Sequence, residues 1–283
     1  MLKKYFTFLA ISLIAAVGCE NQINPEDSTP VEPTYPEYQL EKTFVGNGAE
    51  NGKTSLNDVS VLWESGDAIK VLWGNNLSNK AIGRPYGSNK SAEFTTSVEE
   101  ADAYYGVYPY GAQSSLNGEV LQVTVPAQQT GLFKDSNIIV AKADENDVMD
   151  FKHVLSYIEF TIDRVGVLKF FCGNPLVGDV KVTDFNADGT LDYQQVASGD
   201  VVTIDIKSSG TYYIAMLPDT KIGGFYFEIT KDGVTQYINS STSKQMKRGG
   251  IVGLGNITSK FANQPPIGAT LEEFEMVEFE FDF

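Results

Sequence analysis

A long succession of short β-prone runs, each closed by turn-forming residues, sets the fold class of this chain. From about Tyr38 onward, runs rich in Val, Ile, Tyr, Phe and Thr alternate with clusters of Gly, Asn, Asp and Ser, the compositions of strands and of turns. Outside the first 18 residues, no window has the 3.6-residue apolar spacing of an amphipathic helix. The sequence therefore predicts an all-β protein built from sandwiches, with strands at, among others, 59–63, 68–73, 103–108, 120–125, 154–162, 167–172, 201–206 and 251–257.

The first 18 residues have the pattern of a bacterial lipoprotein signal peptide. Lys3 and Lys4 form a basic n-region and residues 6–16 an apolar h-region, and this segment is removed rather than folded. The apolar run is too short to span a bilayer comfortably. We predict cleavage before Cys19 and lipidation of that cysteine, with the protein held on the outer membrane and facing outward. The alternative is an ordinary secretory signal that happens to leave a cysteine nearby.

Charge excludes one class of partner. The net charge is −16, and removal of the signal, which carries two lysines and no acid, leaves −18 on 265 residues. Nucleic acid repels so acidic a chain and is not expected as a partner. Residues 19–37 hold four prolines and five acidic residues but no basic one, so we expect an extended linker.

The remaining length suits two domains. A boundary near residues 163–166 predicts an N-terminal sandwich over 38–165 and a C-terminal sandwich over 166–262. Residues 263–283 form a separate tail after the Pro265-Pro266 break.

The tail alternates aromatic and acidic residues with a period of two, which gives a strand with one apolar and one anionic face. Such a strand either pairs within its own domain or is offered to another subunit, because exposed strand edges invite β-augmentation. The candidate donor residues are Phe274, Met276, Phe279, Phe281 and Phe283.

The sequence offers little catalytic chemistry. Serine-hydrolase, phosphate-loop and zinc-protease motifs are missing, and no pair of carboxylates stands out for glycoside cleavage. His153 is the single histidine and is expected to be structural rather than catalytic. Cys172 is expected to be a small buried hydrophobe. We therefore predict a protein that is not an enzyme and uses no cofactor.

One segment resembles a calcium-binding loop. Asp184, Asn186, Asp188 and the Thr190 carbonyl have the spacing of oxygen ligands in such a loop. Its twelfth position is Gln195 where a bidentate Glu is required. The alternative is a hairpin turn, for which Asp-Gly is a strong signal.

Aromatic residues suggest an alternative function, a surface lipoprotein that binds glycans by stacking on sugar rings. The competing interpretation places the same side chains in the core, and burial of the two tryptophans distinguishes the two. The candidates are Trp63, Trp73, Tyr104, Tyr105, Tyr108 and Tyr110.

Five short segments stand in a fixed order between about residues 40 and 257. They are Trp63-Glu64-Ser65-Gly66-Asp67-Ala68-Ile69-Lys70-Val71, Ala103-Tyr104-Tyr105-Gly106-Val107-Tyr108-Pro109-Tyr110, Val125-Pro126-Ala127-Gln128-Gln129-Thr130, Phe151-Lys152-His153-Val154-Leu155-Ser156 and Ala215-Met216-Leu217-Pro218. Each is weak alone, but together and in order they resemble the fimbrillin family, the lipoprotein subunits of type V pili.

The resemblance implies two tandem transthyretin-like (Greek-key) β-sandwich domains and a pilus subunit or fimbrillin-like adhesin. It also implies that a trypsin-like protease removes the first strand, here 38–45, and that the opened groove accepts a C-terminal strand from the next subunit. The implied partners are other fimbrillin-like subunits or the chain itself, together with a ligand on a host or bacterial surface.

The chain departs from the family at the cleavage site. Major fimbrillins are cut after arginine, but the first arginine here is Arg84, and a cut there would delete both tryptophans. Lys53 is better placed. Either the chain is cut at Lys53, or it keeps its first strand and its lipid, as an anchor or cap would.

Overall fold

The computed structural model describes residues 39–48, 62–263 and 276–279, and it is all-β with several sheets. The described residues belong to one compact unit. The signal peptide, the linker, Cys19 and Lys53 lie outside the described residues, as do Phe274, Phe281 and Phe283, so the predictions made for them stay predictions.

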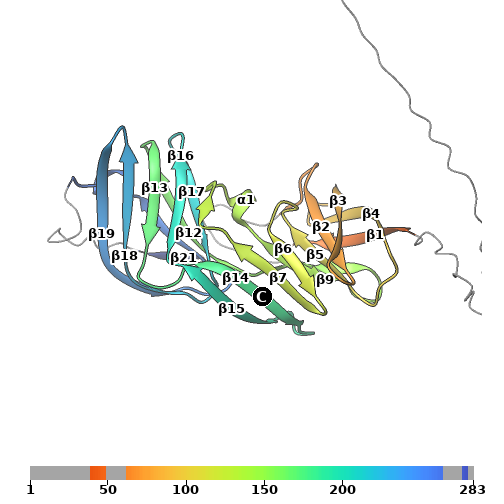
Figure 1. The fold of residues 1–283 in the computed structure, drawn as a ribbon. Coiled ribbons are helices and arrows are strands. Elements are labelled where there is room, and N and C mark those ends of the chain that lie inside the picture. The colour runs from red at the N-terminus through yellow and green to blue at the C-terminus, as the bar shows by residue number, and fades with distance from the viewer. Residues whose placement is uncertain (1–38, 49–61, 264–275, 280–283) are drawn as a thin grey trace, which may run out of the picture. The chain divides into compact units, whose positions relative to one another are not determined.

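The first sheet has eight strands and is drawn mainly in orange and yellow in Figure 1. The order is β10 (Val148–Asp150), β1 (Leu40–Asn47), β4 (Ser91–Val98), β3 (Leu77–Tyr86), β2 (Ala68–Trp73), β5 (Tyr104–Tyr108), β9 (Ile139–Lys142), β11 (Lys152–His153). An isolated bridge between Ala143 and Met149 links the residue after β9 to β10, which lies at the other end of this order.

The second and third sheets pack face to face, with Phe160 on β12 and Phe227 on β18 in ring contact at 5.5 Å. The second sheet has the order β17 (Gly210–Met216), β12 (Ser156–Ile162), β20 (Ile251–Asn256), β21 (Val277–Phe279). The third has the order β19 (Val234–Gln245), β18 (Lys221–Lys231), β13 (Gly166–Phe171), β16 (Val201–Ile206), β8 (Gln128–Gln129).

The fourth sheet joins segments that are far apart in the sequence, because β7 pairs with β14. Its order is β15 (Leu191–Gly199), β14 (Val177–Phe185), β7 (Val120–Val125), β6 (Ser114–Asn117), and Figure 1 shows it beside the strands of the first sheet. The helices of the described residues are α1 (Phe133–Ser136) and the 3-10 turn Thr258–Lys260. Neither has the length and apolar character needed to cross a bilayer.

Two hydrophobic cores fill the sheets. The first core lies within residues 44–151 and is lined by the first sheet. The second core draws on residues from Leu72 to Phe261. The expected boundary at 165/166 falls between β12 and β13, while β12 pairs with β17 and β20 and β7 pairs with β14. The division into two domains stays a prediction.

Strand bounds follow the sequence closely where apolar and polar residues alternate. The strands expected at 68–73, 120–125 and 201–206 are β2, β7 and β16. The strand expected at 59–63 is wrong in its described part, because Leu62 and Trp63 lie outside any strand. Trp63 is fully buried all the same, because it enters the first core from a loop.

Candidate functional site

The first strand, β1, occupies an interior place in its sheet. It pairs antiparallel with β4 along all eight residues, from Leu40 opposite Val98 to Asn47 opposite Ser91. Its last three residues also pair in parallel with β10. We call the space between β4 and β10, with the side chains that β1 contacts there, the seat of β1.

Three residues of β1 face the first core, as a period of two requires. Phe44 is completely buried, and its ring contacts that of Tyr104 at 5.4 Å between centroids. Lys42 Nζ lies 4.9 Å from the centroid of Tyr104 and 2.7 Å from Asp147 Oδ1, so the ammonium group covers the rim of the core. The third inward residue, Gly46, contributes no side chain.

A cluster of aromatic rings lies below Gly46. Trp63 contacts Phe94, Phe151 and Tyr108 edge to face, at centroid distances of 5.0, 5.3 and 5.4 Å. We call these four residues the aromatic cluster. Edge-to-face packing adds to the free energy of burying the rings.

Glycines on three strands leave room for this cluster. A β-carbon at Gly46 on β1 would lie 2.6 Å from Phe94 Cε2, and one at Gly83 on β3 would lie 2.8 Å from Phe94 Cε1. A β-carbon at Gly106 on β5 would lie 2.8 Å from Phe151 Cζ. A real β-carbon does not approach this closely, so the sheet accommodates the rings only because these positions are glycine.

The outward side of β1 is polar. Thr43 Oγ1 and Thr95 Oγ1 share a hydrogen bond of 2.8 Å. Asn47 Nδ2 donates to Asp150 Oδ1 at 2.8 Å, and Ser91 Oγ donates to Asn47 Oδ1 at 2.8 Å. Cross-strand pairs of this kind fix the register of a strand.

The loop that carries Trp63 is held by a buried carboxylate. Asp67, which is 5% exposed, accepts hydrogen bonds from Glu64 N at 2.7 Å and Tyr108 Oη at 3.3 Å. Lys134 Nζ from α1 lies 2.9 Å from Asp67 Oδ1 and 2.9 Å from Glu64 Oε2. Hydrogen bonds to these carboxylates raise the pKa of Lys134, while burial raises the pKa of Tyr108. The group is an ion pair that fastens α1 to the loop.

His153 is a structural residue, as the sequence predicts. It is 2% exposed, and its Nδ1 lies 2.9 Å from Asn137 Oδ1, which also accepts a hydrogen bond from Tyr157 Oη at 3.1 Å. Burial, with a contribution from the charge of Arg248, lowers the pKa of His153 to about 3. The imidazole is therefore neutral at neutral pH and sealed from substrates.

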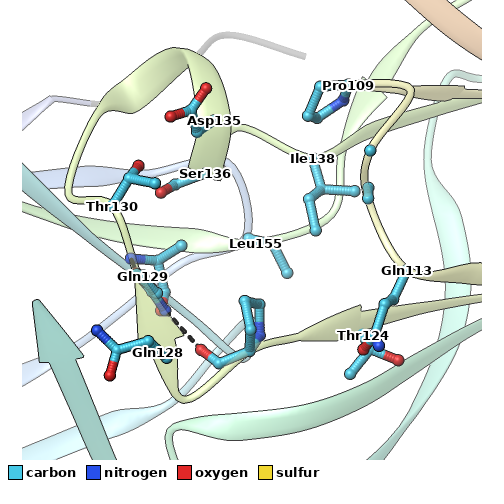
Figure 2. Close-up of a pocket in the computed structure, with 14 residues that line it drawn as sticks. Pro109, Gln113, Thr124, Gln128, Gln129, Thr130, Asp135, Ser136, Ile138 and Leu155 are labelled. Carbon is cyan, nitrogen blue, oxygen red and sulfur yellow. Dashed lines mark hydrogen bonds between the residues drawn. The ribbon is translucent and has the colours of Figure 1, made fainter. Parts of the chain in front are cut away.

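A pocket of about 470 Å³ is lined by Ser136 and Ile138, the chain neighbours of Asn137, and by Leu155. In Figure 2, Leu155 stands between Gln129 on one side and Ile138 and Pro109 on the other. The Gln129 side chain is engaged already, because Nε2 donates to Ala215 O at 2.7 Å and Oε1 accepts from Ala215 N at 2.9 Å. None of the fourteen lining residues is aromatic, so the pocket offers no stacking surface for a sugar.

The aromatic residues considered for glycan binding are core residues with one exception. Trp63 and Trp73 are 0% and 5% exposed, and Tyr104, Tyr105 and Tyr108 are buried as well. Tyr110 is 42% exposed, with Lys80 Nζ 5.1 Å from its ring centroid. Burial of both tryptophans favours a structural role over glycan binding.

The candidate calcium loop is the turn of a hairpin between β14 and β15. Asp188 Oδ1 accepts from the Thr190 N–H at 3.0 Å and from its hydroxyl at 2.7 Å. Asn186 Nδ2 donates to Thr190 Oγ1 at 3.0 Å, and the pKa of Asp188 is lowered by its bonds to Thr190. Asp184 Oδ1 accepts from the N–H of Phe185 at 2.8 Å. Within 39–48, 62–263 and 276–279, no group of three or more His, Cys, Asp or Glu residues is placed to hold a metal ion.

The described part of the tail pairs within the chain. β21 runs antiparallel to β20, with Phe279 opposite Ile251 and Val277 opposite Gly253. Met276 is half-buried against the second core. Cys172 is a free, buried cysteine, as expected.

Sequence reasoning identified the motif segments but not their interactions. Asp67, Gln129 and His153 each lie in one of the five segments, and each forms a buried hydrogen bond to a residue distant in the chain. The first strand, expected at 38–45, runs from Leu40 to Asn47, so the expectation wrongly placed Gly46 in the loop that follows. A glycine inside a strand was its available signal, because it marks a close approach of other groups.

Known proteins provide the remaining comparison. The sequence model of the fimbrillin-like family matches residues 53–253. No curated protein matches the chain. A crystal structure from Bacteroides ovatus, described as a candidate cell adhesion protein, is 14% identical with a TM-score of 0.47, and the match covers 86% of this chain and 98% of that one.

Two structures from Parabacteroides distasonis are also similar. A candidate cell adhesion protein is 8% identical with a TM-score of 0.37, covering 86% of this chain and 100% of its own. A fimbrial assembly protein is 7% identical with a TM-score of 0.34, covering 77% of this chain and 91% of its own.

Proposed function

Because the chain belongs to the fimbrillin-like family, we propose that it is a structural and adhesive fimbrial subunit that joins its neighbours by exchanging β-strands. A lipid on Cys19 holds it at the outer membrane. In this role it performs no catalysis. Its partners are other fimbrillin-like subunits and, at the exposed end of a fimbrium, a surface ligand.

The place of β1 in its sheet carries this proposal. β1 comes before all other described strands yet is flanked on both sides by β4 and β10. A single cut after it, as at Lys53, would separate it from the rest of the chain. Its departure would leave unpaired those backbone N–H and C=O groups of β4 that bond to β1, and it would open the first core at Phe44. A strand from a neighbour restores both the hydrogen bonds and the burial.

The tail is the candidate donor. In the described residues it contributes β21 at the end of the second sheet's strand order, next to β20 alone. A three-residue edge strand makes few backbone hydrogen bonds, so its release costs little compared with the burial of a longer strand in a neighbour's seat. We propose that residues 274–283 are the donor strand that enters the neighbouring subunit.

We further propose that residues 38–165 and 166–262 correspond to the two tandem transthyretin-like domains. The division is supported by the first core, all of whose buried members lie between residues 44 and 151. The strand pairs that cross residue 165 would then fasten the two domains together.

Deletion of residues 269–283 in the producing bacterium tests the exchange. Native gels of protease-treated surface material should lose the higher assemblies that contain this subunit. Deletion of residues 20–30 in the linker serves as the control and should leave them in place. Assemblies that persist without the tail would contradict strand donation.

Replacement of Cys19 by alanine tests the anchor separately. The variant should leave the membrane fraction and become soluble in the periplasm or the medium. Continued membrane association would contradict lipidation at Cys19, whatever the outcome of the tail deletion.

A further inference from the structure

We propose that the seat of β1 selects its occupant. It takes a strand that carries a large aromatic residue and, two positions later, a glycine, with no acidic residue at the outward positions of Thr43, Val45 and Asn47, and it rejects the chain's own tail. The inference rests on the proposed strand exchange, and it makes the incoming subunit a different protein rather than a second copy of this chain.

The first filter is steric and acts at the position of Gly46. A side chain there would meet Phe94 Cε2 at 2.6 Å and Phe151 Cε2 at 3.2 Å. Neither the Phe94 ring nor the Phe151 ring has free space into which it could move. Phe94 is completely buried against Trp63, and its far edge already lies over Gly83 at a distance that leaves no room for a β-carbon.

Phe151 is confined in the same way. It is completely buried, contacts Trp63 at 5.3 Å, and lies over Gly106 at a distance that excludes a β-carbon. The seat therefore has space for one large side chain, at the position of Phe44. Two residues further on, at the position of Gly46, the packed rings leave no space for any side chain. Overfilling such a core is unfavourable because rings and backbone must shift together.

The tail has no glycine to place at the position of Gly46. No glycine or alanine occurs from Thr270 to Phe283, and the aromatic face continues at every second residue through Phe279, Phe281 and Phe283. Any register in which the tail spans the seat therefore places a large or charged side chain at the position of Gly46.

The second filter is electrostatic. Glu93 lies opposite Val45 in the register of β4, Asp147 accepts the salt bridge from Lys42, and Asp150 accepts a hydrogen bond from Asn47. Carboxylates therefore border the seat, and β1 places the Lys42 ammonium group and the Asn47 amide next to two of them. The tail would bring like charges to this border, which is unfavourable across a strand pair; its acidic residues are Glu272, Glu273, Glu275, Glu278, Glu280 and Asp282.

Competition for the vacated seat tests the selection. A recognition sequence for a site-specific protease is inserted between Gly52 and Lys53 of the full chain, and the cut protein is loosened in mild denaturant. It is then returned to native buffer with an excess of labelled peptide, and capture is measured by native mass spectrometry. The peptides are residues 38–52, the same peptide with Gly46→Val, and residues 270–283.

We expect capture of the 38–52 peptide and roughly 10- to 100-fold weaker capture of its Gly46→Val form. The tail peptide should bind no better than the Gly46→Val form. A 38–52 peptide with Val45→Ala, changed on the outward face, is the matched control and should bind within a few-fold of the parent.

A redesigned tail peptide provides the rescue. Phe281→Gly and Phe283→Gly create an aromatic-x-glycine pattern after Phe279, and Glu278→Thr, Glu280→Thr and Asp282→Asn remove the charge. This peptide should be captured at least about ten-fold better than the native tail. Restoring the three acids alone should weaken capture, and added salt should relieve that loss.

The outcomes separate the two proposals. Equal capture of the native tail and the 38–52 peptide would overturn the selection but support strand exchange at this seat. Failure of every peptide, including 38–52, would count against strand exchange itself and against the selection that rests on it.

Discussion

The side-chain amide of Gln129 forms two hydrogen bonds with the backbone of Ala215, one as acceptor and one as donor. Its Oε1 accepts from Ala215 N at 2.9 Å and its Nε2 donates to Ala215 O at 2.7 Å. Gln129 lies in β8 and Ala215 in β17, which belong to different sheets. One side chain therefore replaces a strand neighbour for Ala215 and ties two segments that lie 86 residues apart.

Replacement of Gln129 by leucine should lower the free energy of unfolding by about 2–4 kcal/mol, because two buried backbone groups lose their partners. Urea unfolding measures the change. Gln128→Leu, at an exposed neighbouring position, is the control and should change stability by less than about 0.5 kcal/mol. Equal effects of the two substitutions would show that the hydrogen bonds between Gln129 and Ala215 contribute nothing to the free energy of unfolding.

Gly46→Ala should destabilise the uncut protein by about 1–3 kcal/mol, because the added methyl group enters the aromatic cluster. Gly223→Ala provides a matched strand position where a β-carbon meets no atom within 4 Å, and it should be neutral within about 0.5 kcal/mol. Thermal unfolding of both variants measures the difference. A Gly46→Ala protein as stable as the parent would remove the steric basis of the selective seat.

Asp67→Ala should lower the free energy of unfolding by about 2–4 kcal/mol, since it leaves the Glu64 N–H and the buried Tyr108 hydroxyl without an acceptor and removes the buried one of the two carboxylates that contact Lys134. Glu64→Ala should cost less than about 0.5 kcal/mol, because the Glu64 side chain is 71% exposed and its ion pair is solvated. Chemical denaturation of both variants makes the comparison. The prediction fails if the exposed carboxylate proves as important as the buried one.

Acid should destabilise the fold through His153. Its pKa in the folded protein, about 3, lies below the value of 6.5 for an exposed histidine, so the unfolded chain binds a proton that the folded one refuses. This contribution to stability is complete above pH 6.5 and declines as the pH falls toward 3, by up to about 1.4 kcal/mol per unit.

Comparison with His153→Gln isolates this effect from the titration of the carboxylates. Between pH 7 and pH 5 the parent should lose about 2 kcal/mol more stability than the variant. Unfolding curves at the two pH values provide the measurement. Parallel losses in the two proteins would mean that His153 titrates normally in the fold.

Cys172 should resist thiol reagents in the folded protein. Its side chain is buried, and burial raises the pKa of the thiol, so little reactive thiolate is present or accessible. In a Cys19→Ala background, labelling should be slow in native buffer and complete in denaturant. Rapid labelling of the native protein would place the thiol at the surface.

Local sequence was sufficient to predict most strands, because alternating burial leaves a period of two in the residues themselves. It was sufficient for β7, in which every second residue is buried. It failed at Trp63, where an apolar stretch enters the core from a loop. It also left the roles of Cys19, Lys53 and the tail as predictions, which now depend on the experiments above.

The amino-acid sequence by itself determined that the chain is β-rich, where several strands lie, β2, β7 and β16 among them, and which short segments resemble a known family. Only the tertiary structure decided that β1 lies between β4 and β10, that Gln129 reaches Ala215, and that Gly46 faces Phe94. The physical reason is the distance along the chain over which each property is determined. Strand propensity depends on neighbours in the chain, whereas pairing, buried hydrogen bonds and the space beside a glycine depend on residues brought together from distant segments.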